Sequence, residues 1–391
     1  MNRRRQQKNK KKNMPTIHKV FITLIIIASA AILALLAYGV LSDDFDFIRE
    51  REHEPDDDEN GEIVVNTPWT TPIPREDILV GIDHYNPLTG VTMDLGLAQR
   101  RPLAIVLNNI STALPMNGVS NADIIYEYPV EGGLSRMLAL YQDFYGVEKV
   151  GSIRSARHYT VQLAGAYDSI LLAAGRSPLA RTEVINMNIP FLNEVEGPLR
   201  DVFFRDRNRI PDRRVDSVHS VVTTSERVLQ WLPAYDFRQT HEEDYSHGFI
   251  FTEDGTPQDG AVADRIVANI SSGKSTAFTY DAAEKIYHVT QYNRDFVDAN
   301  DNSQPAFSNV LILKMSVTRL RNDSSGRLDI VTTGSGDGYF AYGGKYIEIT
   351  WSRDSVTSPF TYTLKNGEPL ELGIGKSFIC IIPTTQSATF G

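Results

Sequence analysis

Charged residues gather at the ends of apolar runs between residues 126 and 159. This stretch holds three arginines and two glutamates: Arg136, Arg154, Arg157, Glu127 and Glu131. Arginine forms paired hydrogen bonds to carboxylate or phosphate that lysine cannot match. If a helix begins near Ser155, its free backbone N–H groups and partial positive charge add to the same volume. The stretch is therefore a candidate site for an anionic or polar ligand.

Two other interpretations of these residues stay open. The arginines could pair with the two glutamates in a structural network, because breaking a buried pair costs roughly 3–5 kcal/mol even where the pair adds no net stability. Alternatively, Glu127 and Glu131 could be the acid and base of a glycan-cleaving or cell-wall hydrolase site, whose chemistry depends on the distance between the carboxylates. No residue is identified as catalytic, and a non-enzymatic role is favoured.

Cofactor and metal sites are not indicated. Gly132-Gly133 follows a predicted strand, but neither a G-x-G-x-x-G nor a Walker sequence occurs, so nucleotide binding is unsupported. The histidines show no H-x-x-x-H or H-x-H spacing, which argues against zinc. The single cysteine, Cys380, lies in the apolar run F-I-C-I-I-P and is expected to be a buried core residue. We predict no cofactor and no metal.

Residues 20–41 form a long uncharged apolar run. A helix needs about 20 such residues to cross roughly 30 Å of hydrocarbon. The core of a cleaved signal peptide is shorter, usually about 7–15 residues, and small residues follow it at the cleavage site. The sequence Y-G-V-L-S at 38–42 is a poor cleavage site. We therefore predict a single-pass transmembrane helix at 20–41.

Flanking charges predict the orientation of this helix. Residues 1–19 carry arginine and lysine without acidic residues, whereas 43–62 are rich in aspartate and glutamate. Because positive charge stays on the cytoplasmic side, 1–19 should be a cytoplasmic basic tail and the following domains extracellular. Residues 42–76, charged and then rich in Pro and Thr, should be a disordered stalk. A membrane flank explains the basic block better than a nucleic-acid partner, which is not expected.

From residue 77 to 235, short apolar runs alternate with helical patterns. Strands are expected at 101–108, 123–130, 135–144, 149–153 and 169–174. Helices are expected at 155–167, 178–186 and 224–232, the first with Ser152 or Ser155 as its N-cap. Strands alternating with helices predict an α/β domain with a mixed sheet.

Beyond residue 235 the pattern becomes one of strands separated by Asp-Gly, Gly-Gly and Asn-Gly turns. One helix is expected near 264–271. The predicted strands lie at 249–252, 276–280, 286–292, 309–317, 328–333, 338–342, 346–351, 360–364 and 377–382. The predicted fold class is α+β: a transmembrane helix, an α/β domain at 77–235 and a mostly β domain at 236–391.

Several motifs together resemble the DUF3048 family of YerB-like bacterial cell-surface lipoproteins. They are Y-E at 126–127, V-E-G-G-L-S-R at 130–136, G-S-I-R-S-A-R-x-Y at 151–159, and W-S-R at 351–353 with G-K-S-F-I at 375–379. The resemblance covers about residues 80–385 and implies a two-domain extracytoplasmic bacterial protein with no assigned activity. The positions that match the family's pattern are Asn108, Asn109, Glu127, Glu131, Arg136, Arg154 and Arg157.

The chain also departs from that family. Relatives carry a lipid-modified cysteine where this chain has the apolar run at 20–41, and the loop at 113–119 lacks their arginine. His219-Ser220 stands where relatives often have His-Asn. The resulting hypothesis is a membrane-anchored extracytoplasmic protein whose arginines bind a polymer or protein of the cell envelope, with Glu127, Glu131 and the asparagines orienting the ligand.

Overall fold

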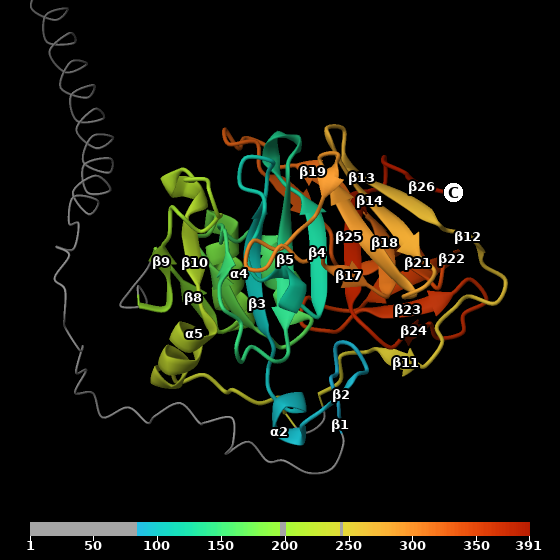
Figure 1. Cartoon of the computed structure of the whole chain (residues 1–391), viewed down its shortest axis with the longest axis horizontal. Coiled ribbons are helices and arrows are strands. Elements are labelled where there is room, and N and C mark those ends of the chain that lie inside the picture. The colour runs from blue at the N-terminus through green and yellow to red at the C-terminus, as the bar shows by residue number, and fades with distance from the viewer. Residues whose placement is uncertain (1–83, 196–200, 243–244) are drawn as a thin grey trace, which may run out of the picture. The chain divides into compact units, whose positions relative to one another are not determined.

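Mixed β sheets make up most of the structure, and its few helices are short (Figure 1). The structure, a computed structural model, describes residues 84–195, 201–242 and 245–391. Its helices are α2 (Leu95–Ala98), α3 (His158–Gly165), α4 (Pro178–Met187) and α5 (Ser225–Trp231), with short 3-10 turns η2 (Val119–Asn121), η3 (Glu131–Gly133), η5 (Ser217–His219) and η6 (Leu232–Ala234).

An 11-stranded sheet runs through the described chain and includes strands from both predicted regions. In spatial order it contains β12 (Ala261–Val262), β22 (Lys345–Arg353), β21 (Gly334–Tyr342), β18 (Asn309–Met315), β25 (Ser377–Pro383), β4 (Ile124–Pro129), β5 (Ser135–Tyr141), β3 (Leu103–Asn109), β7 (Ile170–Ala173) and β8 (Phe191–Asn193), with β23 (Thr361–Leu364) beside β22. The parallel pairing of β25 with β4 joins the two regions within one sheet.

A second, six-stranded sheet packs against the first. It contains β16 (Arg294–Asp295), β15 (Ile286–Gln291), β14 (Lys274–Asp281), β13 (Arg265–Ser271) and β26 (Ala388–Phe390), with β17 (Ala306–Phe307) beside β15. Smaller sheets complete the fold: β6 (Val150–Gly151) with β10 (Val221–Thr223) and β9 (Phe204–Arg205), β1 (His84–Tyr85) with β2 (Thr92–Met93), β11 (Ile250–Thr252) with β24 (Glu371–Gly373), and β19 (Val317–Arg319) with β20 (Leu328–Ile330).

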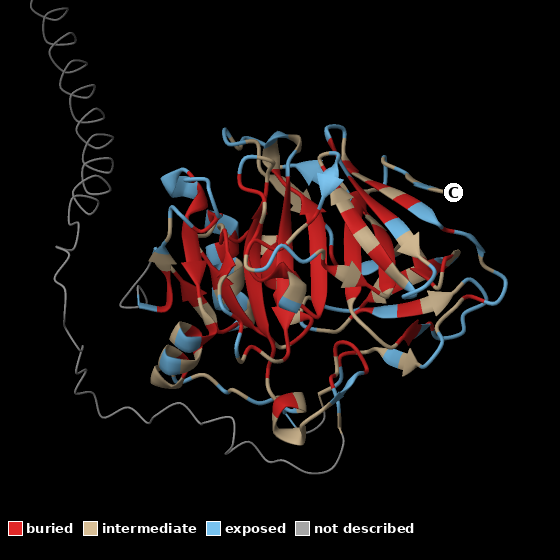
Figure 2. Cartoon of the chain, viewed as in Figure 1, coloured by how far each residue is buried: buried red, intermediate tan, exposed pale blue. Residues whose placement is uncertain are grey.

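The large sheet is buried on both faces (Figure 2). Successive residues of a strand point to opposite faces, and β25 shows the consequence. Phe378 and Cys380 belong to the hydrophobic cluster that includes the six-stranded sheet, whereas Ile379 and Ile381 belong to the cluster that includes α3. Two-sided burial explains why these strands are continuous apolar runs rather than alternating ones. It also confirms Cys380 as a buried core residue.

Two local predictions are wrong. The helix expected at 264–271 is strand β13, whose residues alternate between buried and more exposed, as a half-buried strand requires. The helix expected from 155 begins at His158 with Arg157 as N-cap. Ser155 is unavailable as the cap because its hydroxyl donates to the carbonyl of Ala174 and its carbonyl accepts from Arg136.

The predicted basic tail, transmembrane helix and stalk, at 1–19, 20–41 and 42–76, lie outside the described residues. Within the part of the chain that is described, no helix combines the length and apolar character needed to cross a bilayer. The division at residue 235 stays a prediction, and the large sheet extends across it.

Removing the side chain of Phe378 should test whether the two sheets share one core. Phe378 has no exposed surface, and its ring centroid lies 5.1 Å from that of Phe278 and 5.2 Å from that of Phe307. Phe378→Ala is expected to lower the free energy of unfolding by about 3–5 kcal/mol, measured by denaturant unfolding of the full chain. The exposed Val262 provides the control, because Val262→Ala should change stability by less than about 0.5 kcal/mol. Equal effects of the two substitutions would contradict a shared core.

Candidate functional site

Six strands of the large sheet run in the same direction: β18, β25, β4, β3, β7 and β8. Their carboxyl ends therefore meet at one edge of the sheet. In open sheets of parallel strands, ligands bind in crevices outside this edge. Glu131 follows the end of β4, Asn108 and Asn109 end β3, and Arg136 lies near the start of the antiparallel strand β5. The predicted site residues thus gather at the carboxyl edge.

Arg154 reaches this edge through a loop between β6 and α3. Its backbone N–H donates to the carbonyl of Val106 in β3, and its carbonyl accepts from Ala174, directly after β7. The loop therefore lies across the ends of two adjacent parallel strands. Arg157, three residues later, is the N-cap of α3. The positive end of that helix points to the same place.

Structurally, six of the seven predicted residues fall into two groups. The first, which we call the Glu127 network, is buried and consists of Glu127, Asn109, Ser135, Lys274, Thr276 and Gln291. One carboxylate oxygen of Glu127 accepts from Asn109 Nδ2 at 2.8 Å and Ser135 Oγ at 2.7 Å. The other accepts from Thr276 Oγ1 at 2.6 Å and Gln291 Nε2 at 3.3 Å. These bonds satisfy the lone pairs of a carboxylate with no exposed surface.

Lys274 supplies the charge that opposes Glu127. Its Nζ lies 3.3 Å from Glu127 Oε1, with side-chain exposures of 2% and 0% respectively. The same ammonium lies 4.5 Å from the centre of the Tyr292 ring, whose hydroxyl donates to the carbonyl of Asn109. Buried charges are tolerated when they are paired and hydrogen-bonded. The Glu127 network therefore joins β4 of the large sheet to β14 of the six-stranded sheet.

The second group, which we call the arginine cluster, consists of Arg136, Arg154, Arg157 and Glu131. Arg157 bonds the Glu131 carboxylate through both Nη2 and Nε. Arg136 Nη2 lies 3.9 Å from Glu131 Oε1, and its Nη1 donates to the carbonyl of Ser155 at 2.6 Å. The Glu131 side chain is 25% exposed. Two guanidiniums thus share one partly exposed carboxylate.

Arg154 differs from the other two arginines. Its Nη1 donates to the carbonyl of Val218 at 2.8 Å, and within the described ranges it forms no salt bridge. Burial, the charge of Arg157 and that of nearby Arg205 lower the pKa of Arg154, although Glu131 acts in the opposite direction. An arginine pKa starts high enough that the guanidinium stays charged. Arg154 is therefore a cation for which the described part of the chain supplies no carboxylate.

The pKa values of Glu131 and Arg136 are shifted by burial and by the charged side chains around them. Burial by itself raises the pKa of Glu131, but the hydrogen bonds and charge of Arg157, with the charge of Arg136, outweigh it, so that the pKa is lowered. Burial and the neighbouring charge of Arg157 lower the pKa of Arg136 to about 10. Positive charge at the cluster is therefore incompletely balanced, and an added anion would relieve it.

Asn108 positions a histidine beside Arg154. Its Nδ2 lies 3.1 Å from Nδ1 of His219. Because an amide N–H donates, Nδ1 accepts and the ring proton resides on Nε2. Burial and the charges of Arg154 and Arg209 lower the pKa of His219, which keeps the ring neutral. Asn108 thus orients the His219 ring at the carboxyl edge.

The burial of Glu127 and Asn109 affects the ligand-binding and hydrolase roles predicted from the sequence. Glu127 and Asn109 have no exposed surface and bond to protein groups, so their side chains hold neighbouring residues in position. A hydrolase that uses Glu127 and Glu131 needs both carboxylates at an open cleft, and the burial of Glu127 does not favour it. Lys274, Thr276 and Gln291 escaped the sequence analysis because they lie more than 140 residues from Glu127 and carry no local motif.

Loss of the Glu127 charge should destabilise the fold strongly. Glu127→Gln leaves the ammonium of Lys274 buried without a counter-charge, and we expect a loss of about 3–5 kcal/mol in the free energy of unfolding. Adding Lys274→Met should recover part of that loss, as measured by a double-mutant cycle in urea. The exposed Glu284→Gln is the control and should have little effect. Additive effects of the two buried substitutions would show that the pair is not coupled.

Acid should weaken the arginine cluster through Glu131. Its pKa is lower in the folded chain, so its stabilising effect is complete above the unfolded value of about 4.3 and is lost as pH falls through the folded value. Over this window the free energy of unfolding should fall less steeply for Glu131→Gln than for the parent chain, as measured by urea unfolding at successive pH values. Parallel pH profiles for the two proteins would rule out this contribution.

Comparison with known proteins agrees with this architecture. The family model described as "Protein of unknown function (DUF3048) N-terminal domain" matches residues 88–237, and that for the DUF3048 C-terminal domain matches 266–379. "Putative lipoprotein YerB" of Bacillus subtilis (strain 168) is 28% identical over 308 residues, covering 78% of this chain and 87% of that protein. The crystal structure of YerB from Bacillus subtilis has a TM-score of 0.66 at 26% identity, covering 78% of this chain and 99% of that one. The chain therefore belongs to the DUF3048 family.

Proposed function

We propose that the chain is a membrane-anchored extracytoplasmic protein that binds an anionic cell-envelope ligand at the arginine cluster. The anchor would be a single transmembrane helix at 20–41, followed by a stalk at 42–76 and two outward-facing regions, an α/β region at 77–235 and a mostly β region at 236–391. The uncharged run at 20–41 behind a basic block supports this. The relative described as a lipoprotein supports membrane association.

One observation carries the proposed binding. Three guanidiniums gather at the carboxyl edge of the sheet, two of them share the carboxylate of Glu131, and Arg154 has no carboxylate partner within the described chain. A phosphate or carboxylate ligand would accept paired hydrogen bonds from Arg154 and relieve the repulsion that it shares with Arg157. The N-terminus of α3 would add to the attraction. No proton transfer is required, which favours binding over catalysis.

The net charge of the chain limits where an anionic ligand can bind. At −10 the protein as a whole repels polyanions. Binding must therefore come from the local cluster, at a distance shorter than the screening length of about 8 Å at physiological salt. A purely structural role for the cluster is the competing explanation, because Glu131 and Arg157 are already paired.

Replacing Arg154 should show whether the arginine cluster binds a ligand or only stabilises the fold. We expect Arg154→Gln to weaken binding of a glycerol-phosphate polymer about tenfold, which corresponds to one charged hydrogen-bonded contact, with little effect on unfolding. Binding would be measured by titration calorimetry on the full chain in detergent. A carboxylated polysaccharide would show which anion is preferred, and neutral dextran should not bind.

Arg265 provides the matched control. It is exposed and begins β13, whose other end at Ser271 bonds Gly133 at the carboxyl edge. Arg265→Gln therefore removes the same charge away from the cluster, so binding should be unchanged. If Arg154→Gln binds each polymer as tightly as the parent chain does, the proposed site is wrong. If it lowers stability while binding stays unchanged, the cluster is structural.

A further inference from the structure

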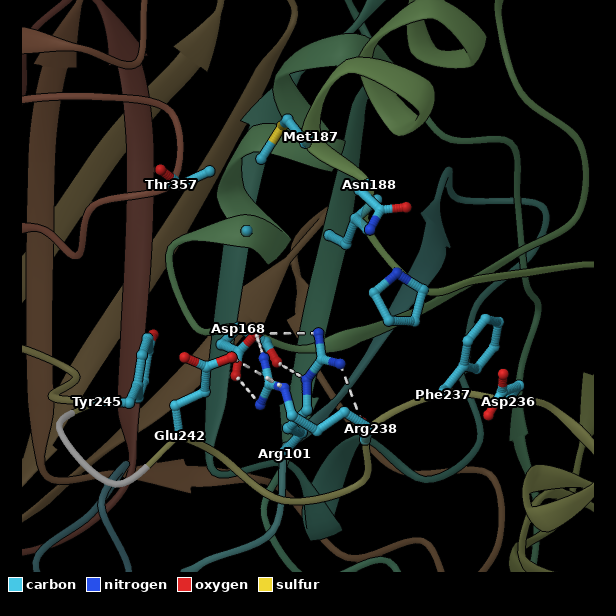
Figure 3. Close-up of a pocket in the computed structure, with 13 residues that line it drawn as sticks. Arg101, Asp168, Met187, Asn188, Asp236, Phe237, Arg238, Glu242, Tyr245 and Thr357 are labelled. Atoms are coloured by element: carbon cyan, nitrogen blue, oxygen red, sulfur yellow. Dashed lines mark hydrogen bonds and ion pairs between the residues drawn. The ribbon is translucent and has the colours of Figure 1, made fainter.

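A cavity of about 830 Å³ lies at the opposite edge of the large sheet (Figure 3). Arg101 precedes β3, Asp168 precedes β7 and Pro190 precedes β8, so the cavity opens at the amino ends of these strands. Residues of 236–242, Tyr245 and a loop that contains Thr357 complete its wall. Its volume falls within the range of about 300–1,000 Å³ that is usual for ligand pockets.

The two arginines that line this cavity already form hydrogen bonds and salt bridges within the protein. Arg101 donates to the carbonyls of Asp168, Ser169 and Arg238 and forms a salt bridge of 3.0 Å to Asp168 Oδ1. Arg238 bonds both carboxylate oxygens of Asp168 at 2.8 Å, as the dashed lines in Figure 3 show. His241 Nδ1 lies 3.0 Å from the same carboxylate. Few donors are left here for an anionic ligand.

The carboxylate of Asp168 is likewise paired within the protein. Burial alone would raise its pKa, but hydrogen bonds from His241 and Arg238 and the charge of Arg101 lower it to about 2. The carboxylate therefore stays charged and paired. Together with the arginines it forms a fixed polar base for the cavity.

Two carboxylates of the lining lack full partners. Asp236 is exposed and makes no hydrogen bond or ion pair within the described residues. Glu242 is 77% exposed, and its carboxylate reaches Arg238 only at 3.6 Å. The C-terminal ends of α3 and α4, at Gly165 and Met187, also line the cavity. Helix C-termini carry partial negative charge and favour cations.

The remaining wall is apolar or aromatic. Met187, Ile189, Pro190, Phe237 and Tyr245 line the cavity, with Phe237 and Tyr245 on opposite sides in Figure 3. An alkyl stem can pack against such a wall while its charged end stays among acceptors. An ammonium can also lie over an aromatic ring. The lining therefore suits a cation carried on an apolar stem.

We propose that this cavity binds a lysine side chain presented by an extended peptide segment. The stem packs on Pro190 and Phe237, and the ammonium lies beside Asp236, next to Phe237 in Figure 3. Glu242, on the other side of the cavity, lies near a flanking part of the peptide. The volume exceeds what one amine needs, so flanking residues of the peptide enter as well. This site is separate from the arginine cluster, since it lies at the other end of the strands and selects the opposite charge.

The test compares two peptides on the full chain in detergent. A fluorescein-labelled Ala-Leu-Lys-Leu-Ala peptide should bind about tenfold more tightly, by fluorescence anisotropy, than the same peptide with norleucine in place of lysine. Norleucine keeps the alkyl stem and removes the charge. Equal affinity for the two peptides, or no measurable binding of the lysine peptide, would overturn the proposal.

Three variants locate the binding. The double substitution Asp236→Asn/Glu242→Gln changes exposed side chains and should reduce lysine-peptide affinity about tenfold. Thr357→Trp, which fills the rim and keeps both carboxylates, should also reduce it. Asp259→Asn removes an exposed charge near the opposite end of the large sheet and should have no effect. A loss with Asp259→Asn equal to that of the double variant would overturn the proposal, because general attraction to an acidic chain would then explain the binding.

Arg154→Gln distinguishes this proposal from the proposed function. It should leave lysine-peptide binding unchanged even if it abolishes binding of the glycerol-phosphate polymer. A reduced affinity for the peptide in this variant would overturn the assignment of two separate sites.

Discussion

A buried carboxylate with a single cationic partner is the constraint on which this fold depends. Glu127 lies on β4, opposite Cys380 of β25 in the strand register, and has no exposed surface. Such a charge is tolerated only if its partners arrive together, and here they come from β3, β5, β14 and β15. A shift of register in any of these strands would leave a buried charge unpaired. The Glu127 network therefore fixes how the two family regions meet.

That constraint also determines what is displayed at the carboxyl edge. Because β3, β4 and β5 are held in register beneath it, Glu131, Arg136 and the loop at Arg154 emerge at fixed positions relative to one another. The Glu127–Lys274 pair is buried, whereas the arginine cluster combines buried Arg136 and Arg157 with partly exposed Glu131 and Arg154. Water reaches Glu131 and does not reach Glu127. A buried network thus holds a partly exposed charged cluster in place.

Sequence reasoning predicted the local features and missed the long-range ones. Apolar runs located β3, β4, β5 and β7 within a few residues, and charge type indicated an arginine-rich edge. The pairing of Glu127 with Lys274 could not be predicted, because no local pattern connects residues that meet only through tertiary folding. The helix expected at 264–271 failed for a different reason. Its buried residues, Ile266, Ala268 and Ile270, have period two, but the apolar Val267 between them hides this alternation in the sequence.

Helix α3 connects the two edges of the sheet physically. Its N-terminus lies at the arginine cluster, and its last residue, Gly165, lines the cavity at the opposite edge. Eight residues at 1.5 Å per residue separate the two ends by about 12 Å. Since the helix dipole is positive at its start and negative at its end, it reinforces donors at one edge and acceptors at the other. The helix dipole thus favours anions at one edge of the sheet and cations at the other.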